Sequence, residues 1–224
     1  MISKFNAKLL CVAMIIGCFN LVFSQDSISK SERVITRKFT FLEFRGTNAI
    51  DIAAGSLQME GDYPEYEYDI YFRIGYKRQL TSHLNANVTF NKYNVSIKDV
   101  SNEGFMSFDL NLEYLFSPYT KFSPFLFAGG GYNAANYFES TATKVQAGLG
   151  FELIVAPHIG LKLFGEYNYL FSDDIDGLIE GDTDDALIRM GLGFNFYFGG
   201  KKKKEMYQRK LKTVINSNQI IPYN

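Results

Sequence analysis

Large apolar residues occupy every second position of the last strand-like stretch, from Ala186 to Phe198, while the positions between them are mostly small or polar. Because successive side chains of a β-strand point to opposite faces, this period of two predicts a strand with one apolar face and one mixed face. The mixed face carries Arg189, Asn195 and two glycines and would make a poor water-facing surface. A strand of a transmembrane barrel instead meets lipid on its apolar side and a tight polar interior on the other.

The same alternation recurs along the chain and predicts eight strands, most of them about the ten residues that cross a bilayer at a tilt. The connections after the second, fourth and sixth strands are short, whereas the others are longer and more polar. With an even number of strands both termini lie at the end with the short turns, which in bacterial outer-membrane barrels faces the periplasm. Glycines obscure the pattern in the fifth strand, so its facing stays unassigned. The predicted strands are Thr47–Leu57, Tyr66–Leu80, Leu84–Asn91, Met106–Phe116, Phe125–Ala134, Lys144–Val155, Ile159–Phe171 and Ala186–Phe198.

The predicted fold class is therefore all-β, an eight-stranded antiparallel up-and-down transmembrane β-barrel. The alternative is a soluble eight-stranded barrel of the lipocalin kind, which would turn the apolar rows inward and the charged rows outward. Such a barrel would have to line its interior with tyrosines and phenylalanines while exposing little but Asn, Thr and Gly. The membrane barrel is therefore favoured.

The N-terminus, residues 1–24, has the features of a secretory signal peptide. Lys4 and Lys8 precede an apolar stretch, and a small residue closes a cleavage site before residue 25. Both cysteines of the chain, Cys11 and Cys18, fall inside this segment, so the mature chain is predicted to have no disulfide and no thiolate. Lipidation at Cys18 is the alternative. We expect export through the general secretory pathway to the bacterial outer membrane.

Length and composition are those of one domain of ordinary size. The 224 residues are 46% hydrophobic and 21% charged, with a formal net charge of −1. The absence of a later apolar run near twenty residues excludes a helical membrane protein, and the near-neutral charge gives no indication of nucleic-acid binding. Within the segment after the signal peptide, Lys38–Phe44 alternates weakly and could stay in the periplasm or lead into the first strand. The predicted organisation is a signal peptide (1–24), a periplasmic lead-in (25–45), the barrel (46–199) and a basic periplasmic tail (200–224).

Three features of the chain are the glycine-rich run Pro124–Tyr132, the hairpin Phe151–Lys162 and the closing strand with its aromatic end. Together they resemble the small outer-membrane barrels of the OmpX/OmpA type. The resemblance covers the mature chain and implies a small outer-membrane barrel, which we expect to be a monomer. It also implies that Phe196 and Phe198 are part of the signal by which the barrel assembly machinery recognises its substrates.

A narrower resemblance covers most of residues 40–224 and is carried by the segments Phe44–Ala53, Gly104–Tyr114, Leu161–Tyr169 and Thr213–Asn218. These segments look like a barrel found in Bacteroidetes proteins associated with curli assembly and secretion. Only about twenty residues separate the predicted cleavage site from the barrel, so the resemblance implies an accessory role rather than the secretion channel itself.

The interior of an eight-stranded barrel is just wide enough to be filled by side chains. Charges of both signs are predicted to point into it, and a buried unpaired charge is costly, so we expect ion pairs and hydrogen bonds that form a polar plug. Glycines 148, 150, 191 and 193 are predicted to leave room for Lys162, Phe164 and Glu166. The alternative is a proton or ion path, and hence a small channel or transporter. The predicted interior residues are Asp69, Arg73, Lys77, Asp109, Glu113, Glu152, Lys162, Glu166 and Arg189.

Catalytic, cofactor and metal sites are not predicted. The only histidines, His83 and His158, lie at short turns, and neither a nucleophile elbow nor a phosphate-binding loop is present. Clustered carboxylates in the loop 172–185 could attract a divalent cation. The loop does not match the EF-hand calcium-binding motif, because aligning it with that motif places Ser172 and Thr183 at the first and last positions, where carboxylates are required. An enzyme acting on lipids or peptides remains a third functional class.

The basic run Lys201, Lys202, Lys203 and Lys204 follows the last strand. A flexible charged tail is the simple interpretation, and docking to an acidic periplasmic partner or to the cell-wall layer is the functional one. The predicted function is a non-enzymatic outer-membrane barrel with a structural or partner-binding role. An accessory role in curli-type fibre assembly is the more specific form of this hypothesis. The expected partners are outer-membrane lipid and lipopolysaccharide, the barrel assembly machinery and a periplasmic or fibre-assembly protein.

Overall fold

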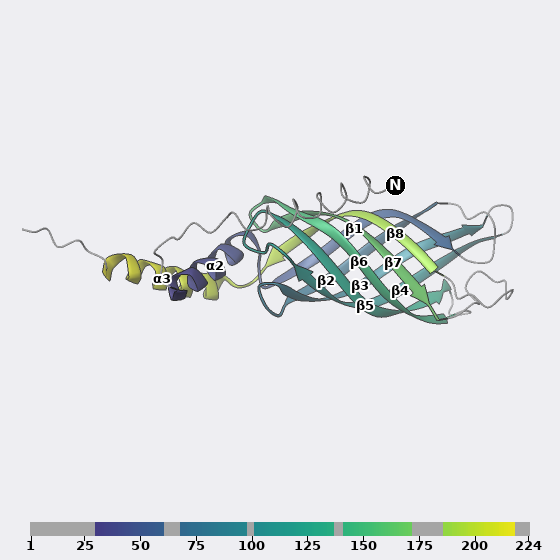
Figure 1. Ribbon diagram of the computed structural model, residues 1–224. Helices are drawn as coiled ribbons and strands as arrows, with labels where there is room; N and C mark the ends of the chain where they lie inside the picture. The colour runs from purple at the N-terminus through teal and green to yellow at the C-terminus, as the bar shows by residue number, and fades with distance from the viewer. Residues whose placement is uncertain (1–29, 61–67, 98–100, 137–140, 172–185, 218–224) are drawn as a thin grey trace, which may run out of the picture. The chain divides into compact units, whose positions relative to one another are not determined.

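The computed structural model describes residues 30–60, 68–97, 101–136, 141–171 and 186–217 (Figure 1). By its internal contacts the chain divides into two units, Met1–Arg33 and Val34–Asn224. The second unit holds the barrel, helix α3 (Lys201–Ser217), and helix α2 (Lys30–Phe44) from Val34 onward. The acid-rich loop 172–185 lies outside the described residues.

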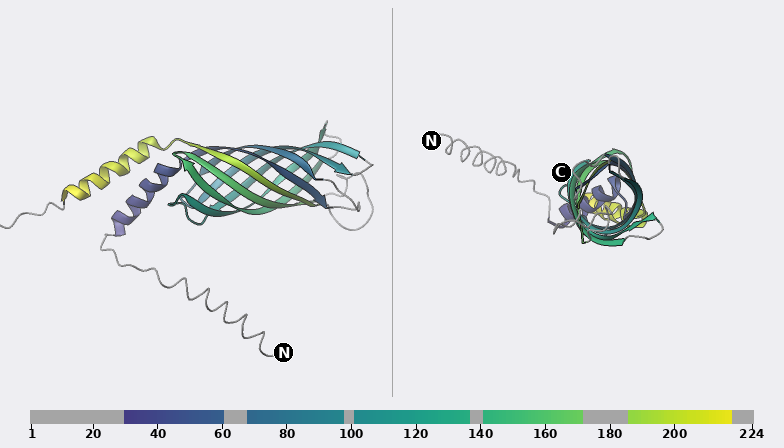
Figure 2. Two further views of the ribbon diagram at one scale, coloured as in Figure 1. Left: turned by 90° about the horizontal axis from the view of Figure 1, so that it is seen from above. Right: turned by 90° about the vertical axis from the view of Figure 1, so that its right-hand side faces the viewer.

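Eight antiparallel strands pair in sequence order and close into a barrel, because β1 pairs with both β2 and β8. The end-on view in Figure 2 shows the closed ring. This confirms the predicted fold class and rules out an open sheet. The strands are β1 (Asn48–Glu60), β2 (Asp69–Gln79), β3 (Leu84–Ile97), β4 (Ser101–Leu115), β5 (Phe122–Ala135), β6 (Thr141–Ala156), β7 (Ile159–Leu170) and β8 (Ala186–Phe198).

The apolar rows of the strands face outward, as predicted. In β8 the side chains of Met190, Leu192 and Phe194 are 65%, 53% and 42% exposed, whereas Arg189 and Asn195 on the alternate face are buried. The same division holds in β2, β4, β6 and β7. Exposed apolar rows around a closed barrel are the arrangement that suits a hydrocarbon solvent, and they argue against the soluble alternative.

Several strands are longer than the apolar alternation predicts. The segment between the predicted third and fourth strands is a loop only in part, because the β3–β4 ladder continues through the pairs Ser96↔Asn102 and Ile97↔Ser101. Likewise β5 begins at Phe122, three residues before its predicted start at Phe125. Polar residues do not break a ladder whose backbone groups remain paired, so polarity alone makes these predicted strands too short.

Two helices flank the barrel in sequence, and neither was predicted. The expectation of a flexible tail is wrong over α3, and Lys38–Phe44, whose alternation suggested a lead-in strand, is the end of α2. Gly199 and Gly200 adopt positive φ values of 76° and 86°, which glycine tolerates and which turn the chain from β8 into α3. Among the described residues, no helix is long and apolar enough to cross a membrane.

Candidate functional site

The centre of the barrel interior is a cluster of buried charges from five strands. Glu166 on β7 accepts hydrogen bonds from Arg73 Nη2 on β2 at 2.7 and 2.8 Å, and Arg189 Nε on β8 lies 2.6 Å from its Oε1. Asp109 on β4 pairs with Lys144 on β6 at 3.0 Å, and Arg189 Nη2 lies 3.5 Å from it. Three cations therefore share two carboxylates in a fully enclosed cluster.

Two further ion pairs lie in the interior between this cluster and the helical end of the barrel. Lys77 on β2 donates to both oxygens of Glu113 on β4, at 2.6 and 2.8 Å, and Asn85 Nδ2 donates to the same carboxylate at 3.0 Å. Lys162 on β7 donates to Asp51 on β1. Each buried lysine thus meets a carboxylate, which is what a dry interior requires.

The helical end is closed by Arg45, which follows α2 and has a fully buried side chain. Its Nε donates to Glu152 of β6 at 2.7 Å, and its Nη1 donates to the carbonyl oxygens of Pro118 and Thr120 at 2.8 and 3.0 Å. Tyr197 and Asn195 of β8 also donate to Glu152. Burial is the largest single influence and lowers the pKa of Arg45, but Glu152 and Tyr197 together outweigh it and raise the pKa of the guanidinium above its ordinary value.

The structure places the predicted interior residues, apart from Asp69, within these buried pairs. Asp69 lies at the rim, half-buried, and accepts from Ser96 at 2.6 and 3.0 Å. The prediction missed Asp51 and Lys144, although the strand alternation already put Lys144 on the inward face of its strand. It also missed Arg45, which lies outside the strands and so carries no alternation signal.

Aromatic rings fill the space between the charges. The Arg73 guanidinium lies 4.7 Å and the Lys162 ammonium 4.5 Å from the ring centre of Phe164. A Cβ at Gly150 would lie 2.8 Å from Phe164 Cβ, and one at Gly191 would lie 2.8 Å from Phe164 Cζ. These glycines therefore leave room for Phe164, as the sequence indicated. Phe125 and Phe127, whose facing was unassigned, also point inward.

The described side chains do not assemble an evident catalytic or metal site. His83 Nδ1 lies 2.8 Å from the carbonyl oxygen of Leu115, and His158 donates its backbone N–H to Phe44 at 3.3 Å, so both histidines sit at the helical end. Groups of three or more His, Cys, Asp or Glu that could hold a metal ion are absent from the described part of the chain. The interior is dominated by mutually paired charges.

The four lysines at the start of α3 do not form one patch. Successive residues of a helix are rotated by about 100° from one another, so four in a row point in different directions. Lys201 and Lys202 are exposed, Lys203 lines a hollow beside the β2–β3 turn, and Lys204 lies 5.6 Å from the ring centre of Phe39 on α2.

The predicted assembly signal lies at the helical end of β8. Phe196 and Phe198 both point outward, and the Phe198 ring lies 6.4 Å from that of Tyr76 on β2. The two phenylalanines thus join the outward aromatic row across the β8–β1–β2 seam. Their role in assembly stays a prediction.

Comparison with solved structures finds small outer-membrane barrels. Neisserial surface protein A is similar over 68% of this chain and 98% of its own, with a TM-score of 0.57 and 16% identity. Ail, the attachment invasion locus protein of Yersinia pestis, covers 69% of this chain and 99% of its own, with a TM-score of 0.47 and 15% identity. The outer-membrane enzyme PagL covers 66% of this chain and 99% of its own, with a TM-score of 0.43 and 16% identity.

At these identities the likeness is one of fold alone, that of a small eight-stranded barrel. No family model matches the sequence, and no curated protein does.

Proposed function

We propose that this protein is a bacterial outer-membrane barrel whose strands cross the bilayer and whose helical end faces the periplasm. The observation that carries the proposal is the outward apolar surface around a closed barrel with buried charges inside. The short connections at the helical end support the orientation, since short turns face the periplasm in bacterial barrels. Outer-membrane lipid and lipopolysaccharide are the expected surroundings, and the barrel assembly machinery is the expected route into the membrane.

We further propose that the barrel is a non-catalytic anchor and not a conduit. Paired charges and aromatic rings occupy the interior from Arg45 at one end to Lys144 toward the other. A path for ions would need mobile or hydrated groups, whereas these carboxylates and cations neutralise one another at hydrogen-bonding distance. The small-channel alternative finds less support in this packing.

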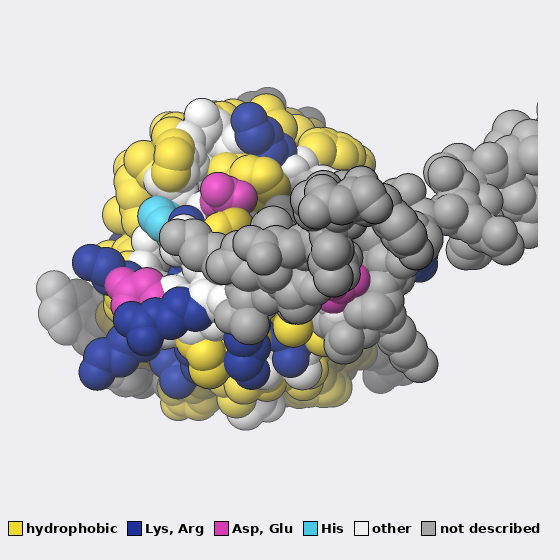
Figure 3. All heavy atoms as spheres, turned by 90° about the vertical axis from the view of Figure 1, so that its left-hand side faces the viewer, with side chains coloured by type: hydrophobic (Ala, Val, Ile, Leu, Met, Phe, Trp, Pro, Cys, Tyr) yellow, Lys and Arg dark blue, Asp and Glu magenta, His cyan; other side chains and the backbone are white. Residues whose placement is uncertain are grey.

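The anchor is proposed to hold a periplasmic partner through one side of α3, which we call the basic face. This face consists of Lys202, Met206, Arg209 and Lys210, all exposed, with a single acid, Glu205, beside them. Figure 3 looks onto this end of the barrel and shows Lys and Arg side chains gathered below the middle of the view. Such a face fits an acidic protein surface. A part in curli-type fibre assembly rests on the sequence resemblance of four segments alone.

Charge reversal on the basic face tests the docking. In Lys202→Glu/Lys210→Glu we expect the yield of crosslinked partner, recovered from cells after crosslinking and purification of the barrel, to fall at least about fivefold, because two attractive contacts become repulsive. The matched control is Lys92→Glu/Lys121→Glu, which makes the same net-charge change outside the basic face and should leave the yield unchanged. Equal yields from both variants and the wild type would overturn the docking, provided that all three reach the outer membrane in equal amounts.

A further inference from the structure

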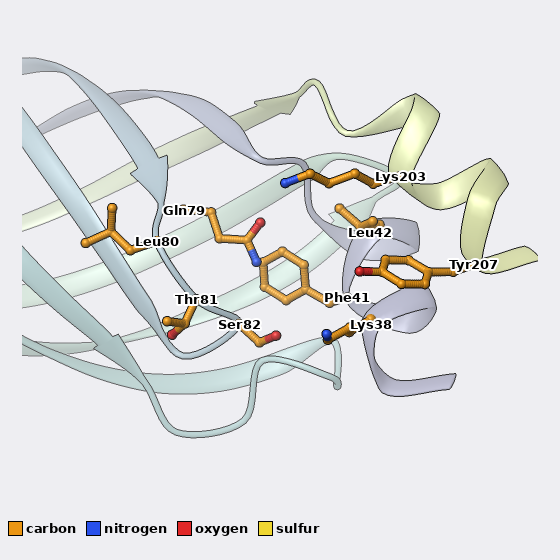
Figure 4. A pocket seen from close by; sticks show the side chains of 9 residues that line it. All are labelled: Lys38, Phe41, Leu42, Gln79, Leu80, Thr81, Ser82, Lys203 and Tyr207. Atoms are coloured by element: carbon orange, nitrogen blue, oxygen red, sulfur yellow. The ribbon is translucent and has the colours of Figure 1, made fainter. Parts of the chain in front are cut away.

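A hollow of about 310 Å³ lies between α2, α3 and the turn that joins β2 to β3. This volume is at the lower end of the range of small-ligand pockets, about 300–1,000 Å³. Phe41 and Leu42 of α2 are buried beside it, and Tyr207 of α3 forms part of its wall. Three segments far apart in the sequence thus build one concave site, which Figure 4 shows from close by.

The charges around the hollow are unbalanced. Lys38 of α2 and Lys203 of α3 line it, and Figure 4 shows both ammonium groups pointing toward the segment 79–82 of the turn. Among the described residues that line it, no carboxylate is present. Both lysines are exposed, so they are charged in water, and the two like charges without a lining carboxylate favour an anionic ligand in the hollow.

The turn adds hydrogen-bond donors to the same site. The Thr81 hydroxyl accepts from the backbone N–H groups of Leu84 at 3.0 Å and His83 at 3.3 Å. Since a hydroxyl has two lone pairs and one proton, this leaves its proton to donate outward. Ser82 and Gln79 supply a further hydroxyl and an amide. Two ammonium groups with neutral donors suit the oxygens of a phosphate group.

The hollow also borders the apolar outer surface of the barrel. Tyr76, Arg78 and Leu80 continue the outward row of β2 to its end, and Leu80, which is 55% exposed, lines the hollow. An aromatic, a cation and then a polar turn in this order mark the level where hydrocarbon gives way to headgroups. A ligand here would thus have a polar part in the hollow and an apolar part against β2.

We propose that the hollow binds the phosphate headgroup of an anionic glycerophospholipid from the leaflet at the helical end, with its acyl chains along the outward row of β2. The inference rests on the membrane location proposed above and goes beyond the anchor role. The site also requires both α2 and α3 to be folded against the barrel, because each helix contributes residues to its lining. An acidic protein would match the lysines but not the adjoining apolar row.

Native mass spectrometry of the full-length protein, purified in detergent and titrated with phosphatidylglycerol, tests the proposal. We expect Lys38→Gln/Lys203→Gln to need a roughly tenfold higher lipid concentration for half-saturation than the wild type, since each lysine near an anionic lipid contributes several-fold. The matched control Lys92→Gln/Lys121→Gln removes the same charge away from the hollow and should bind like the wild type. Zwitterionic phosphatidylethanolamine should bind more weakly than phosphatidylglycerol.

Three results would overturn the lipid site. They are equal binding by the hollow variant and the wild type, an equal loss in the control variant, or full displacement of the lipid by millimolar inorganic phosphate, which would identify a free anion as the ligand. Fractionation of the same strains separates the two proposals. A barrel that reaches the outer membrane but fails the lipid titration overturns this inference alone, whereas a barrel absent from that membrane overturns the proposed function.

Discussion

Glu166→Gln is expected to lower the free energy of unfolding by about 3–5 kcal/mol, the usual cost of removing one partner from a buried ion pair. Glu166 lies between Arg73 and Arg189. Its neutralisation leaves Asp109 as the one carboxylate of the central cluster for three cations, Arg73, Lys144 and Arg189. The cost arises because neither arginine can reach water from inside the barrel.

Urea unfolding of the protein refolded into lipid vesicles measures this change. Glu103→Gln is the matched control, because it removes the same charge from an exposed position at the start of β4, where a change within about 0.5 kcal/mol is expected. A Glu166→Gln barrel as stable as the wild type would mean that the cluster does not hold the interior together.

Leu192→Arg tests the other face of the same sheet and should destabilise the membrane-inserted barrel by about 2–4 kcal/mol. Leu192 stands midway along the outward row of β8, between Met190 and Phe194, and is 53% exposed. A guanidinium there would lie near the bilayer centre, where it can be hydrated only by snorkelling or by distorting the membrane. In water the same substitution on an exposed side chain would cost little.

Val155→Arg provides the depth control, because Val155 points outward at the end of β6, beside the short turn before His158. Near the interface the cost should fall to about 0–1 kcal/mol. Unfolding in vesicles compares both variants with the wild type. Equal costs at the two positions would contradict the proposed placement of β8 across the bilayer.

The fold could be predicted from the sequence because a period of two assigns every side chain of a strand to one of two faces. In β8 the alternation of Met190, Leu192 and Phe194 with Arg189 and Asn195 is enough to fix both faces and their opposite polarity. Eight such segments with alternating short and long connections leave few topologies besides an up-and-down barrel.

The facing of β5 could not be predicted, because polarity and facing disagree there. Phe125 and Phe127 point inward although they are apolar. Their rings lie where the neighbouring strand β6 has glycines and therefore no side chains. A Cβ at Gly148 of β6 would lie 2.4 Å from Phe127 Cζ, and one at Gly150 would lie 2.7 Å from Phe125 Cζ. This packing of rings over glycines depends on how two strands pair, and the alternation within one strand gives no information about that pairing.

The helical end was missed for a different reason. Arg45 is a single position between two elements, and only the closed barrel brings Glu152, more than a hundred residues later, to its side chain. The helices themselves did leave a signal. Ile35, Phe39 and Leu42 recur at the spacing of one helix face, which differs from the period of two that identifies strands.

The most direct test of the account is the position of single tryptophans relative to the lipid chains, and the chain contains no tryptophan of its own. Leu110→Trp and Leu192→Trp replace outward residues of β4 and β8, whereas Phe164→Trp replaces an inward ring of β7. In vesicles of lipids brominated along their acyl chains, we predict strong quenching of the two outward tryptophans and little quenching of the inward one. Quenching of the inward tryptophan with protection of the outward two would contradict the claim that the apolar rows meet hydrocarbon.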